Sequence, residues 1–246
     1  MIPGFLRRLL FVLLLAAPAA ALAALPAVQA PVRYMALGDS LAAGYKAMPA
    51  TAGYAYQLYL GRAFGSIPDV LFDNASVPGA TSQDVLTFQL PQSGLFQPNV
   101  VTISVGGNDL LSLLDGSPIT PERVAAVIAQ FAQNLGQILG GLCLGMPPGG
   151  QIYLHTLYEI PDIPETAFAV PAFNQALNGV VNQLSLFPAC TDKTLGVADV
   201  YRAFLGQKGL LLMERYQKKG INVLEVHPTN KGHRVIEDQF RALLPR

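Results

Sequence analysis

The sequence of 246 residues has few charges, few metal-binding side chains and no tryptophan. Only 13% of its residues are charged, and 16 basic residues balance 16 acidic ones, so nothing indicates a nucleic-acid partner. The two cysteines lack the neighbouring ligands that a metal site needs, and no G-x-G-x-x-G motif opens a helix after a strand. The lack of tryptophan mildly disfavours a sugar-stacking platform, although Tyr45, Tyr54 and Tyr158 could substitute for it. We therefore expect no metal and no cofactor.

The apolar residues are concentrated at the N-terminus, where residues 1–30 have the composition of a secretory signal peptide. Arg7 and Arg8 precede an apolar run of roughly a dozen residues and then several small residues, with cleavage expected near Ala23. Pro18 interrupts the run, and the segment before it is short for a span of about 20 residues. We expect an exported protein, secreted or periplasmic, with no stable membrane span after cleavage. Residues 31–246 are expected to form a single domain, whose oligomeric state the sequence does not indicate.

The only two cysteines are Cys143 and Cys190. An even pair in an exported chain suggests one disulfide, which would close a loop of nearly fifty residues. Two free buried thiols are the alternative, because cysteine also serves as a small core residue.

After the leader, short apolar runs alternate with longer helical patterns, which is typical of a parallel sheet covered on both faces. The expected strands are residues 32–38, 70–76, 99–106, 151–158 and 194–201. The expected helices are residues 52–65, 120–142, 167–187 and about 229–243. The strand at 99–106 has a nearly continuous apolar run and is predicted to be central.

Polar residues and glycines follow these strands at the edge where α/β sheets bind ligands. Ser40 follows the first strand, Gly79 the second and Asn108 the third, while His227 precedes the last helix. These residues supply the parts of an acyl-transfer site. Ser40 is the candidate nucleophile and His227 its base, and the N–H groups of Ser40 and Gly79 with the Asn108 amide are candidate oxyanion donors. The alternative for Ser40 is a helix cap.

Four sequence blocks, in order, carry a resemblance to a known family. "GDSLAAGY" contains Ser40, the second block contains Gly79, "GGND" contains Asn108 and "HPTNKGH" contains His227. On these blocks the chain resembles the GDSL, or SGNH, hydrolases. The resemblance implies a flavodoxin-like three-layer α/β/α sandwich with a five-stranded parallel sheet. It also implies cofactor-free hydrolysis of esters or thioesters, by an esterase or lipase acting on a small-molecule or lipid substrate.

One position departs from the family pattern. The family usually has an aspartate three residues before its catalytic histidine, and this chain has Leu224 there. A leucine cannot orient an imidazole or stabilise its charged form. Three replacements are open: a backbone carbonyl near residues 224–225, which we favour, then Glu225, then Asp199. Leu224 also motivates a second hypothesis, an SGNH-fold binding protein with impaired catalysis.

The remaining histidines are weaker candidates. His155 lies in the apolar fourth strand and is interpreted as a core residue with its hydrogen bonds satisfied, and His233 is expected inside the last helix. Tyr158 is either a pocket residue or part of an ordinary connection. A general α/β-hydrolase is disfavoured because the G-x-S-x-G elbow is missing around Ser40.

Overall fold

The structure is a computed structural model that describes residues 31–66, 69–164, 166–218 and 221–244. Residues Pro31–Arg246 form one compact unit. The expected signal peptide at residues 1–30, with its cleavage point near Ala23, lies outside the described residues.

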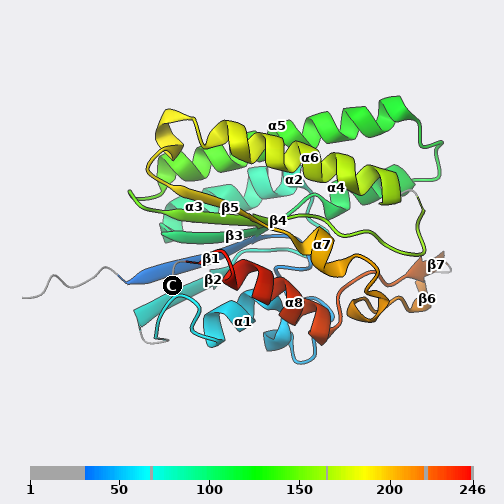
Figure 1. Ribbon diagram of the computed structural model, residues 1–246, viewed down its shortest axis with the longest axis horizontal. Coiled ribbons are helices and arrows are strands. Elements are labelled where there is room, and N and C mark those ends of the chain that lie inside the picture. The colour runs from blue at the N-terminus through cyan, green and yellow to red at the C-terminus, as the bar shows by residue number, and fades with distance from the viewer. Residues whose placement is uncertain (1–30, 67–68, 165, 219–220, 245–246) are drawn as a thin grey trace, which may run out of the picture. The chain divides into compact units, whose positions relative to one another are not determined.

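A sheet of five parallel strands forms the centre of this unit (Figure 1). The strands are β1 (Val32–Gly38), β2 (Val70–Asn74), β3 (Val100–Ser104), β4 (Gln151–His155) and β5 (Thr194–Ala198). Their order across the sheet is β2-β1-β3-β4-β5, the order of doubly wound flavodoxin-like folds. The predicted fold class, an α/β three-layer sandwich with a five-stranded parallel sheet, is therefore confirmed.

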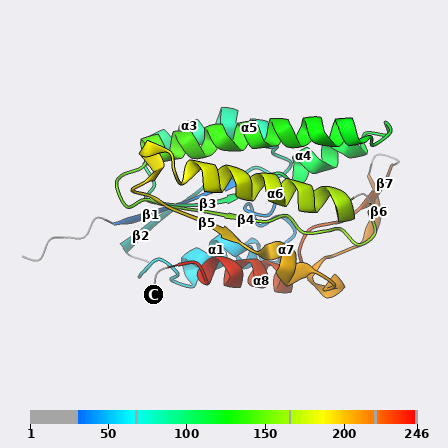
Figure 2. The same ribbon diagram turned by 45° about the horizontal axis from the view of Figure 1, so that its top comes forward.

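Helices cover both faces of the sheet (Figure 2). The α-helices are α1 (Tyr54–Leu60), α2 (Ser82–Asp84), α3 (Leu90–Phe96), α4 (Gly107–Leu111), α5 (Pro121–Gly145), α6 (Thr166–Leu184), α7 (Val200–Phe204) and α8 (Asn230–Arg241). A π-helical turn, η3, spans Val85–Gln89, and 3-10 turns lie at Ala50–Ala52, Ser112–Leu114, Pro188–Cys190 and Lys208–Leu210. Helices α3, α5 and α6 lie on one face, and α1, α7 and α8 on the other.

The core is split between these two faces by the alternation of side chains along each strand. In β1, Met35 and Leu37 belong to the cluster under α5 and α6, whereas Tyr34 and Ala36 belong to the cluster under α1 and α8. All five residues of β3 are buried, as expected for a central strand covered on both faces. The sheet is therefore a rigid base for the residues that follow its strands.

The clearest helix start predicted from the sequence is confirmed. Thr120 precedes α5, and its hydroxyl accepts a hydrogen bond from the Arg123 N–H at 3.3 Å, with Pro121 in the first turn. Within the described residues, α5 is the one helix long and apolar enough to cross a membrane by length and composition. It packs through buried residues such as Phe131 and Leu135 into the core.

Cys143, near the end of α5, is joined to Cys190 by a disulfide, the first of the two alternatives open for this pair. Both residues are buried in the cluster under α5 and α6. The bond links α5 covalently to the 3-10 turn that precedes β5, the strand at one edge of the sheet.

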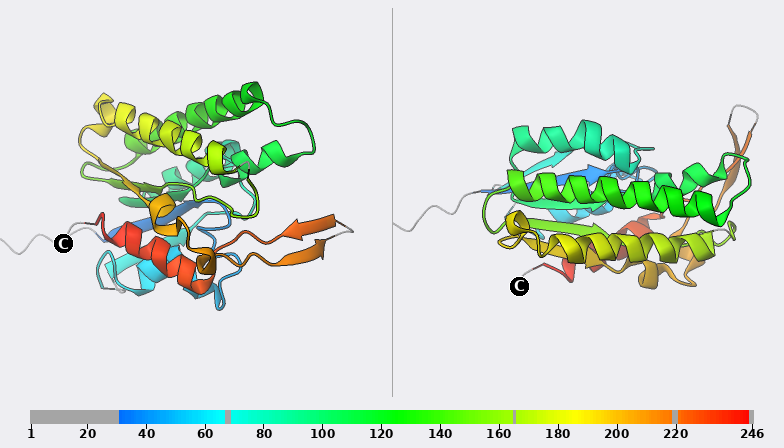
Figure 3. Two further views of the ribbon diagram at one scale, coloured as in Figure 1. Left: turned by 45° about the vertical axis from the view of Figure 1, so that its right-hand side comes forward. Right: turned by 90° about the horizontal axis from the view of Figure 1, so that it is seen from above.

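Several parts of the chain differ from the sequence-based expectation. Four of the strands were predicted two or three residues too long at their C-terminal ends, because the chain stays buried after it leaves the sheet, as at Val105 and Leu157. The helical segment from α2 to α3 and the antiparallel pair β6 (Arg215–Lys218) and β7 (Ile221–Leu224) were not predicted. This pair projects from the body next to the segment that carries His227 (Figure 3).

Candidate active site

The turn after β1 fixes the position of Ser40. Gly38 has a φ of +125°, and a Cβ atom there would lie 1.9 Å from the Ser104 carbonyl oxygen, so only glycine fits between β1 and β3. The Asp39 N–H donates to that same carbonyl at 3.0 Å. The Asp39 carboxylate accepts hydrogen bonds from the Leu41 N–H at 3.0 Å and the Ser104 hydroxyl at 2.7 Å. Burial raises the pKa of Asp39 to about 6, although these two hydrogen bonds oppose the shift.

A buried glutamine that the sequence analysis missed also holds this turn. The Gln89 side chain accepts from the Gly38 N–H at 2.6 Å and donates to the Gly38 carbonyl at 2.8 Å. Gln89 lies in the π-helical turn η3, a feature often found near functional sites. The Gly38 carbonyl also accepts the Val77 N–H at 3.0 Å, so both backbone groups of Gly38, just before Ser40, are hydrogen-bonded.

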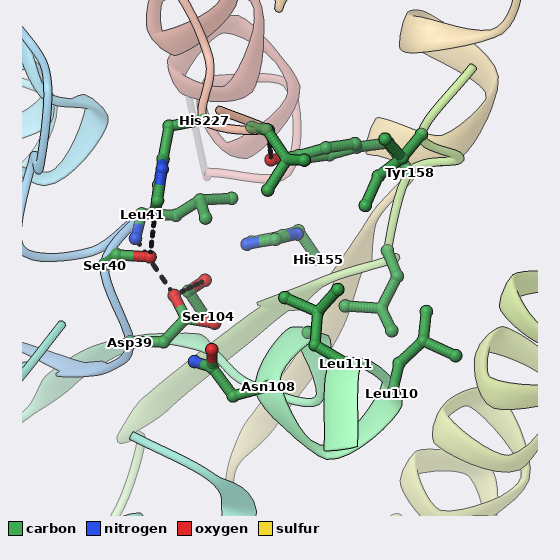
Figure 4. Close-up of a pocket in the computed structure, with 14 residues that line it drawn as sticks. Asp39, Ser40, Leu41, Ser104, Asn108, Leu110, Leu111, His155, Tyr158 and His227 are labelled. Atoms are coloured by element: carbon green, nitrogen blue, oxygen red, sulfur yellow. Dashed lines mark hydrogen bonds between the residues drawn. The ribbon is translucent and has the colours of Figure 1, made fainter. Parts of the chain in front are cut away.

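His227 meets Ser40 directly. Its Nε2 atom lies 2.7 Å from the Ser40 Oγ, and a dashed line marks this contact in Figure 4. His227 comes just before α8, which begins after the capping residue Thr229. The ring of Tyr45 packs edge-on against the imidazole, with 4.8 Å between the ring centroids. The candidate nucleophile and the candidate base therefore stand at the hydrogen-bond distance that proton transfer requires.

The other ring nitrogen of His227 contacts a carboxylate. Its Nδ1 atom hydrogen-bonds Glu225 Oε1, which also accepts the N–H of Val226 at 3.1 Å and of His227 itself at 3.3 Å. Glu225 is only 3% exposed, and the Lys46 ammonium lies 3.4 Å from its second oxygen. Burial acts to raise the pKa of Glu225. The hydrogen bonds from His227, the charge of His227 and the hydrogen bond from Lys46 outweigh burial, so the pKa of Glu225 is lowered.

This contact overturns the expectation that a backbone carbonyl holds His227, because the carboxylate of Glu225 occupies Nδ1 instead. Asp199 lies elsewhere: it caps α7 by accepting the Arg202 N–H at 3.1 Å. Leu224 is the last residue of β7, and the carboxylate follows it by one position. The Glu225 N–H donates to the Glu214 carbonyl at 2.7 Å, which fixes this segment as it leaves the hairpin.

The three candidate oxyanion donors come from three strand ends. Within the described residues, neither the Ser40 N–H nor the Gly79 N–H donates to another protein group. Gly79 has a φ of +90°, a conformation that favours glycine. Asn108 lines the same cavity as Ser40 and His227, and its amide donates to the Ala80 carbonyl at 2.9 Å. Gly79 does not line this cavity; it lines a separate hollow with Ala80, whose carbonyl accepts the Asn108 hydrogen bond.

The cavity beside Ser40 is largely apolar. Its lining includes Leu41, Leu110, Leu111, Leu157, Tyr158, Ile160 and Val226 together with the polar residues of the site. Tyr158 is thus a pocket residue, and its hydroxyl donates to the Val226 carbonyl at 3.0 Å. The cavity volume of about 90 Å³ has room for several groups the size of a water molecule.

The other two histidines are buried, and neither is fully hydrogen-bonded, so the expectation that the hydrogen bonds of His155 are satisfied is wrong. His233 lies inside α8 and its Nδ1 accepts from the Tyr54 N–H at 3.4 Å, while its Nε2 has no partner in the described part of the chain. His155 ends β4 and also lines the cavity, a position that the sequence did not reveal. Burial lowers the pKa of both histidines to about 4, so both are neutral at pH 7. No group of three metal-ligating side chains occurs among the described residues.

This arrangement agrees with a comparison against known families. A model of the GDSL-like Lipase/Acylhydrolase family matches residues 36–235, more than half of the chain. The chain belongs to this family. The match begins within β1, just before Ser40, and ends within α8. It therefore contains the four sequence blocks with Ser40, Gly79, Asn108 and His227. No curated protein sequence matches the chain.

Solved structures share the fold of this GDSL-like protein at low sequence identity. The acetylxylan esterase Axe2 from Geobacillus stearothermophilus has a TM-score of 0.64 and 16% identity, with 86% of this chain and 93% of that one covered. The extracellular lipase from Streptomyces rimosus has a TM-score of 0.60 and 19% identity, covering 87% and 100%. TesA has a TM-score of 0.58 and 22% identity, covering 86% and 97%. These likenesses show the fold.

A buried polar network supports the Asn108 loop and was also missed from the sequence. The Asp109 carboxylate accepts hydrogen bonds from the Ser82 hydroxyl and, at 2.9 Å, from the Ser82 N–H. The Ser82 hydroxyl in turn accepts from the Asn134 amide of α5 at 3.0 Å. The network ties the loop after Gly79 to the helix that carries Asn108, so two oxyanion candidates of this family member share one support.

Proposed function

We propose that this protein hydrolyses carboxylic esters through an acyl-enzyme intermediate on Ser40. The observation that carries the proposal is the continuous chain of contacts from Ser40 Oγ to His227 Nε2 and from His227 Nδ1 to Glu225. A serine hydroxyl is a weak nucleophile at neutral pH, and it needs a base that is itself held in the correct tautomer. Membership of the GDSL-like Lipase/Acylhydrolase family supports the same reaction class.

In the proposed first half-reaction, Ser40 Oγ attacks the ester carbonyl carbon while His227 Nε2 takes the hydroxyl proton. The resulting imidazolium is stabilised by the Glu225 carboxylate, and the oxyanion accepts hydrogen bonds from the Ser40 N–H, the Gly79 N–H and the Asn108 amide. The carbonyl then re-forms, the bond to the alcohol oxygen breaks, and His227 returns its proton to the leaving alcohol.

In the second half-reaction, water attacks the acyl-enzyme and His227 takes one of its protons. Collapse of the second oxyanion breaks the bond to Ser40 Oγ, which recovers its proton from His227 and releases the carboxylic acid. The apolar cavity beside Ser40 is suited to the acyl group. The hypothesis of an impaired binding protein is the less favoured one, since its motivation was the missing carboxylate at Leu224 and Glu225 supplies a carboxylate at His227.

The test is hydrolysis of p-nitrophenyl acetate, butyrate, octanoate and palmitate by the purified protein and by Ser40→Ala. An acyl-CoA thioester is added to the series, because the resemblance to GDSL hydrolases also implies thioesters. We expect activity with at least one substrate in the original protein and its loss in the variant. If both proteins are equally inert across the series, the hydrolase proposal is wrong and a binding role is favoured.

We also propose that the protein is exported after removal of a signal peptide. The support is the basic, apolar and small-residue order of residues 1–30 together with the disulfide between Cys143 and Cys190, a bond that persists in oxidising compartments. N-terminal sequencing of the protein purified from its host, after fractionation, tests this. A mature N-terminus near residue 24 in the exported fraction is expected, and an intact Met1 in the cytosolic fraction would contradict it.

A further inference from the structure

A second apolar hollow adjoins the cavity beside Ser40, and Leu110 and Leu111 line both spaces. Figure 4 shows these two leucines projecting from α4 on the side of the cavity away from Ser40. The second space, the outer hollow, is lined by these leucines, by Leu113 and Leu114 in the 3-10 turn after α4, by Ile119 before α5 and by Phe168 in the first turn of α6.

The outer hollow offers a ligand apolar surface and no charge. Among the described residues that line it, only Thr166 is polar. The Thr166 hydroxyl donates to the Ile163 carbonyl at 2.7 Å and accepts from the Ile160 N–H at 3.0 Å, so its hydrogen bonds are already made. Ile160 lines the cavity beside Ser40, and its hydrogen bond to Thr166 therefore joins the walls of the two spaces. A hydrocarbon group is the ligand chemistry that such a lining suits.

The outer hollow is accessible from solvent. Phe168 is 56% exposed and Leu114 is 42% exposed. Leu111, which both spaces share, is partly exposed. Exposed apolar side chains that gather beside a candidate active site indicate a ligand-binding surface. A hydrocarbon chain that leaves the cavity across Leu111 therefore meets the side chains of Leu114 and Phe168.

The size of the cavity beside Ser40 decides which acyl groups need this further surface. At about 10–15 Å³ for each water-sized group, the cavity volume of about 90 Å³ holds roughly six to nine such groups. A methylene group is of similar size. The acyl chain of a butyrate ester therefore fits within the cavity, whereas the chain of a laurate ester extends beyond it.

We propose that the outer hollow binds the distal part of a long acyl chain, and that Leu114 and Phe168 are specificity-determining residues for chain length. The preferred substrates are then fatty acyl esters whose chains are too long for the cavity. The inference rests on the proposed ester hydrolysis at Ser40. Each methylene group that leaves water for an apolar site strengthens binding by about fourfold. Because these contacts are made equally in the substrate complex and in the transition state, they lower KM and leave kcat unchanged.

The test compares p-nitrophenyl butyrate with p-nitrophenyl laurate, both below the concentrations at which they form micelles. We expect kcat/KM for the laurate to exceed that for the butyrate by about tenfold or more. In Phe168→Ser this ratio should fall by about tenfold, through a higher KM for the laurate, because the contacts of about two methylene groups are lost. Phe168→Leu, which keeps an apolar side chain, should retain most of the ratio. A ratio of one or less in the original protein, or an unchanged ratio in Phe168→Ser, would overturn the inference.

Leu95→Ser is the matched control, because Leu95 on α3 is 87% exposed and lines neither space. The laurate-to-butyrate ratio should be unchanged in it, and a fall equal to that in Phe168→Ser would refute a role specific to the outer hollow. Circular dichroism melts establish that each variant folds. Size-exclusion chromatography and sedimentation with phosphatidylcholine vesicles test the other occupants. If Phe168→Ser alters self-association or vesicle binding and leaves the ratio unchanged, the surface serves a second copy or a lipid surface and the inference is wrong.

A second readout is independent of turnover. Ser40→Ala should bind cis-parinaric acid, a long-chain fatty acid whose fluorescence rises in apolar surroundings, and laurate should displace it at concentrations where butyrate does not. The double variant Ser40→Ala, Phe168→Ser should bind it about tenfold more weakly. Such binding without any hydrolysis by the original protein would refute the hydrolase proposal while supporting the outer hollow. Hydrolysis without this binding and without a preference for laurate would refute the role of the outer hollow alone.

Discussion

Replacement of Glu225 by glutamine isolates the charge that faces His227. The substitution keeps the size of the side chain and an oxygen that can accept from the backbone N–H groups at 3.1 and 3.3 Å. It removes the negative charge beside Nδ1, so the imidazolium that forms in the proposed attack by Ser40 loses its counter-charge. Glu225 is 3% exposed, and solvent cannot substitute for the lost carboxylate.

The expected effect follows from Coulomb's law. Two unit charges about 4 Å apart interact by about 4 kcal/mol at an effective dielectric constant of about 20. Each 1.36 kcal/mol in the barrier changes the rate by about tenfold, so kcat should fall by about 10³. Loss of the orienting acid in the worked serine triad lowers kcat by about 10⁴, which sets the upper end of the range. KM should change little, because Glu225 does not line the cavity.

The assay measures kcat and KM with the best p-nitrophenyl ester of the series. Asp199→Asn is the matched control: it removes a carboxylate at a helix cap, where asparagine caps equally well, and should leave kcat unchanged. Lys46→Met should lower kcat by no more than a few-fold, because the Lys46 side chain is 40% exposed and its ion pair is screened. A loss of less than about tenfold in Glu225→Gln, or an equal loss in Asp199→Asn, would refute this account of the triad.

Three further predictions concern the oxyanion site, the disulfide and the buried histidines. Asn108→Ala should lower kcat by about 10² to 10³ with little change in KM, measured with the same ester. Replacing Cys143 and Cys190 together by alanine should lower the free energy of unfolding by up to about 4 kcal/mol in urea titrations, because the bond closes a loop of 47 residues in sequence separation. Burial lowers the pKa of His155 and His233 to about 4, so the unfolded chain binds protons between pH 6.5 and 4 that the folded chain does not. Stability is therefore full above about pH 6.5 and falls by about 3 kcal/mol per histidine as the pH drops toward 4.

Asp39 opposes part of this pH dependence. Burial raises the pKa of Asp39 to about 6. The contribution of Asp39 to the free energy of unfolding is therefore greatest below about pH 3.8 and is lost as the pH rises to 6. Because two histidines outweigh one aspartate of similar shift, urea titrations at pH 4.5 should still give a lower free energy of unfolding than at pH 7. His233→Phe should reduce that difference. An equal difference in His233→Phe would show that other groups control the loss of stability at low pH. For the disulfide between Cys143 and Cys190, removal of the bond without any fall in the free energy of unfolding would contradict the prediction.

The sequence contained enough to predict the fold and to single out Ser40, Asn108 and His227, three residues that line one cavity in the structure. Strand and helix patterns alternate with little ambiguity, and parallel strands bring their C-terminal ends to one edge, so Ser40, Gly79 and Asn108 were expected near one another. His227 was chosen as the candidate base because it lies in the fourth sequence block, just before the last predicted helix. These features depend on local patterns and on the topology that the patterns imply.

The tertiary structure alone decided which acceptor meets His227 and which further residues serve the site. The sequence left three acceptors open and favoured a backbone carbonyl over Glu225 and Asp199, because the path of the chain after Leu224 depends on the β6–β7 pair, which the pattern did not predict. Gln89 and Asp109 act over separations of 51 and 27 residues, and no local signal marks such contacts. His155 followed the expected burial, but its Nε2 has no hydrogen-bond partner among the described residues, because its surroundings come from several elements that meet only in the folded protein.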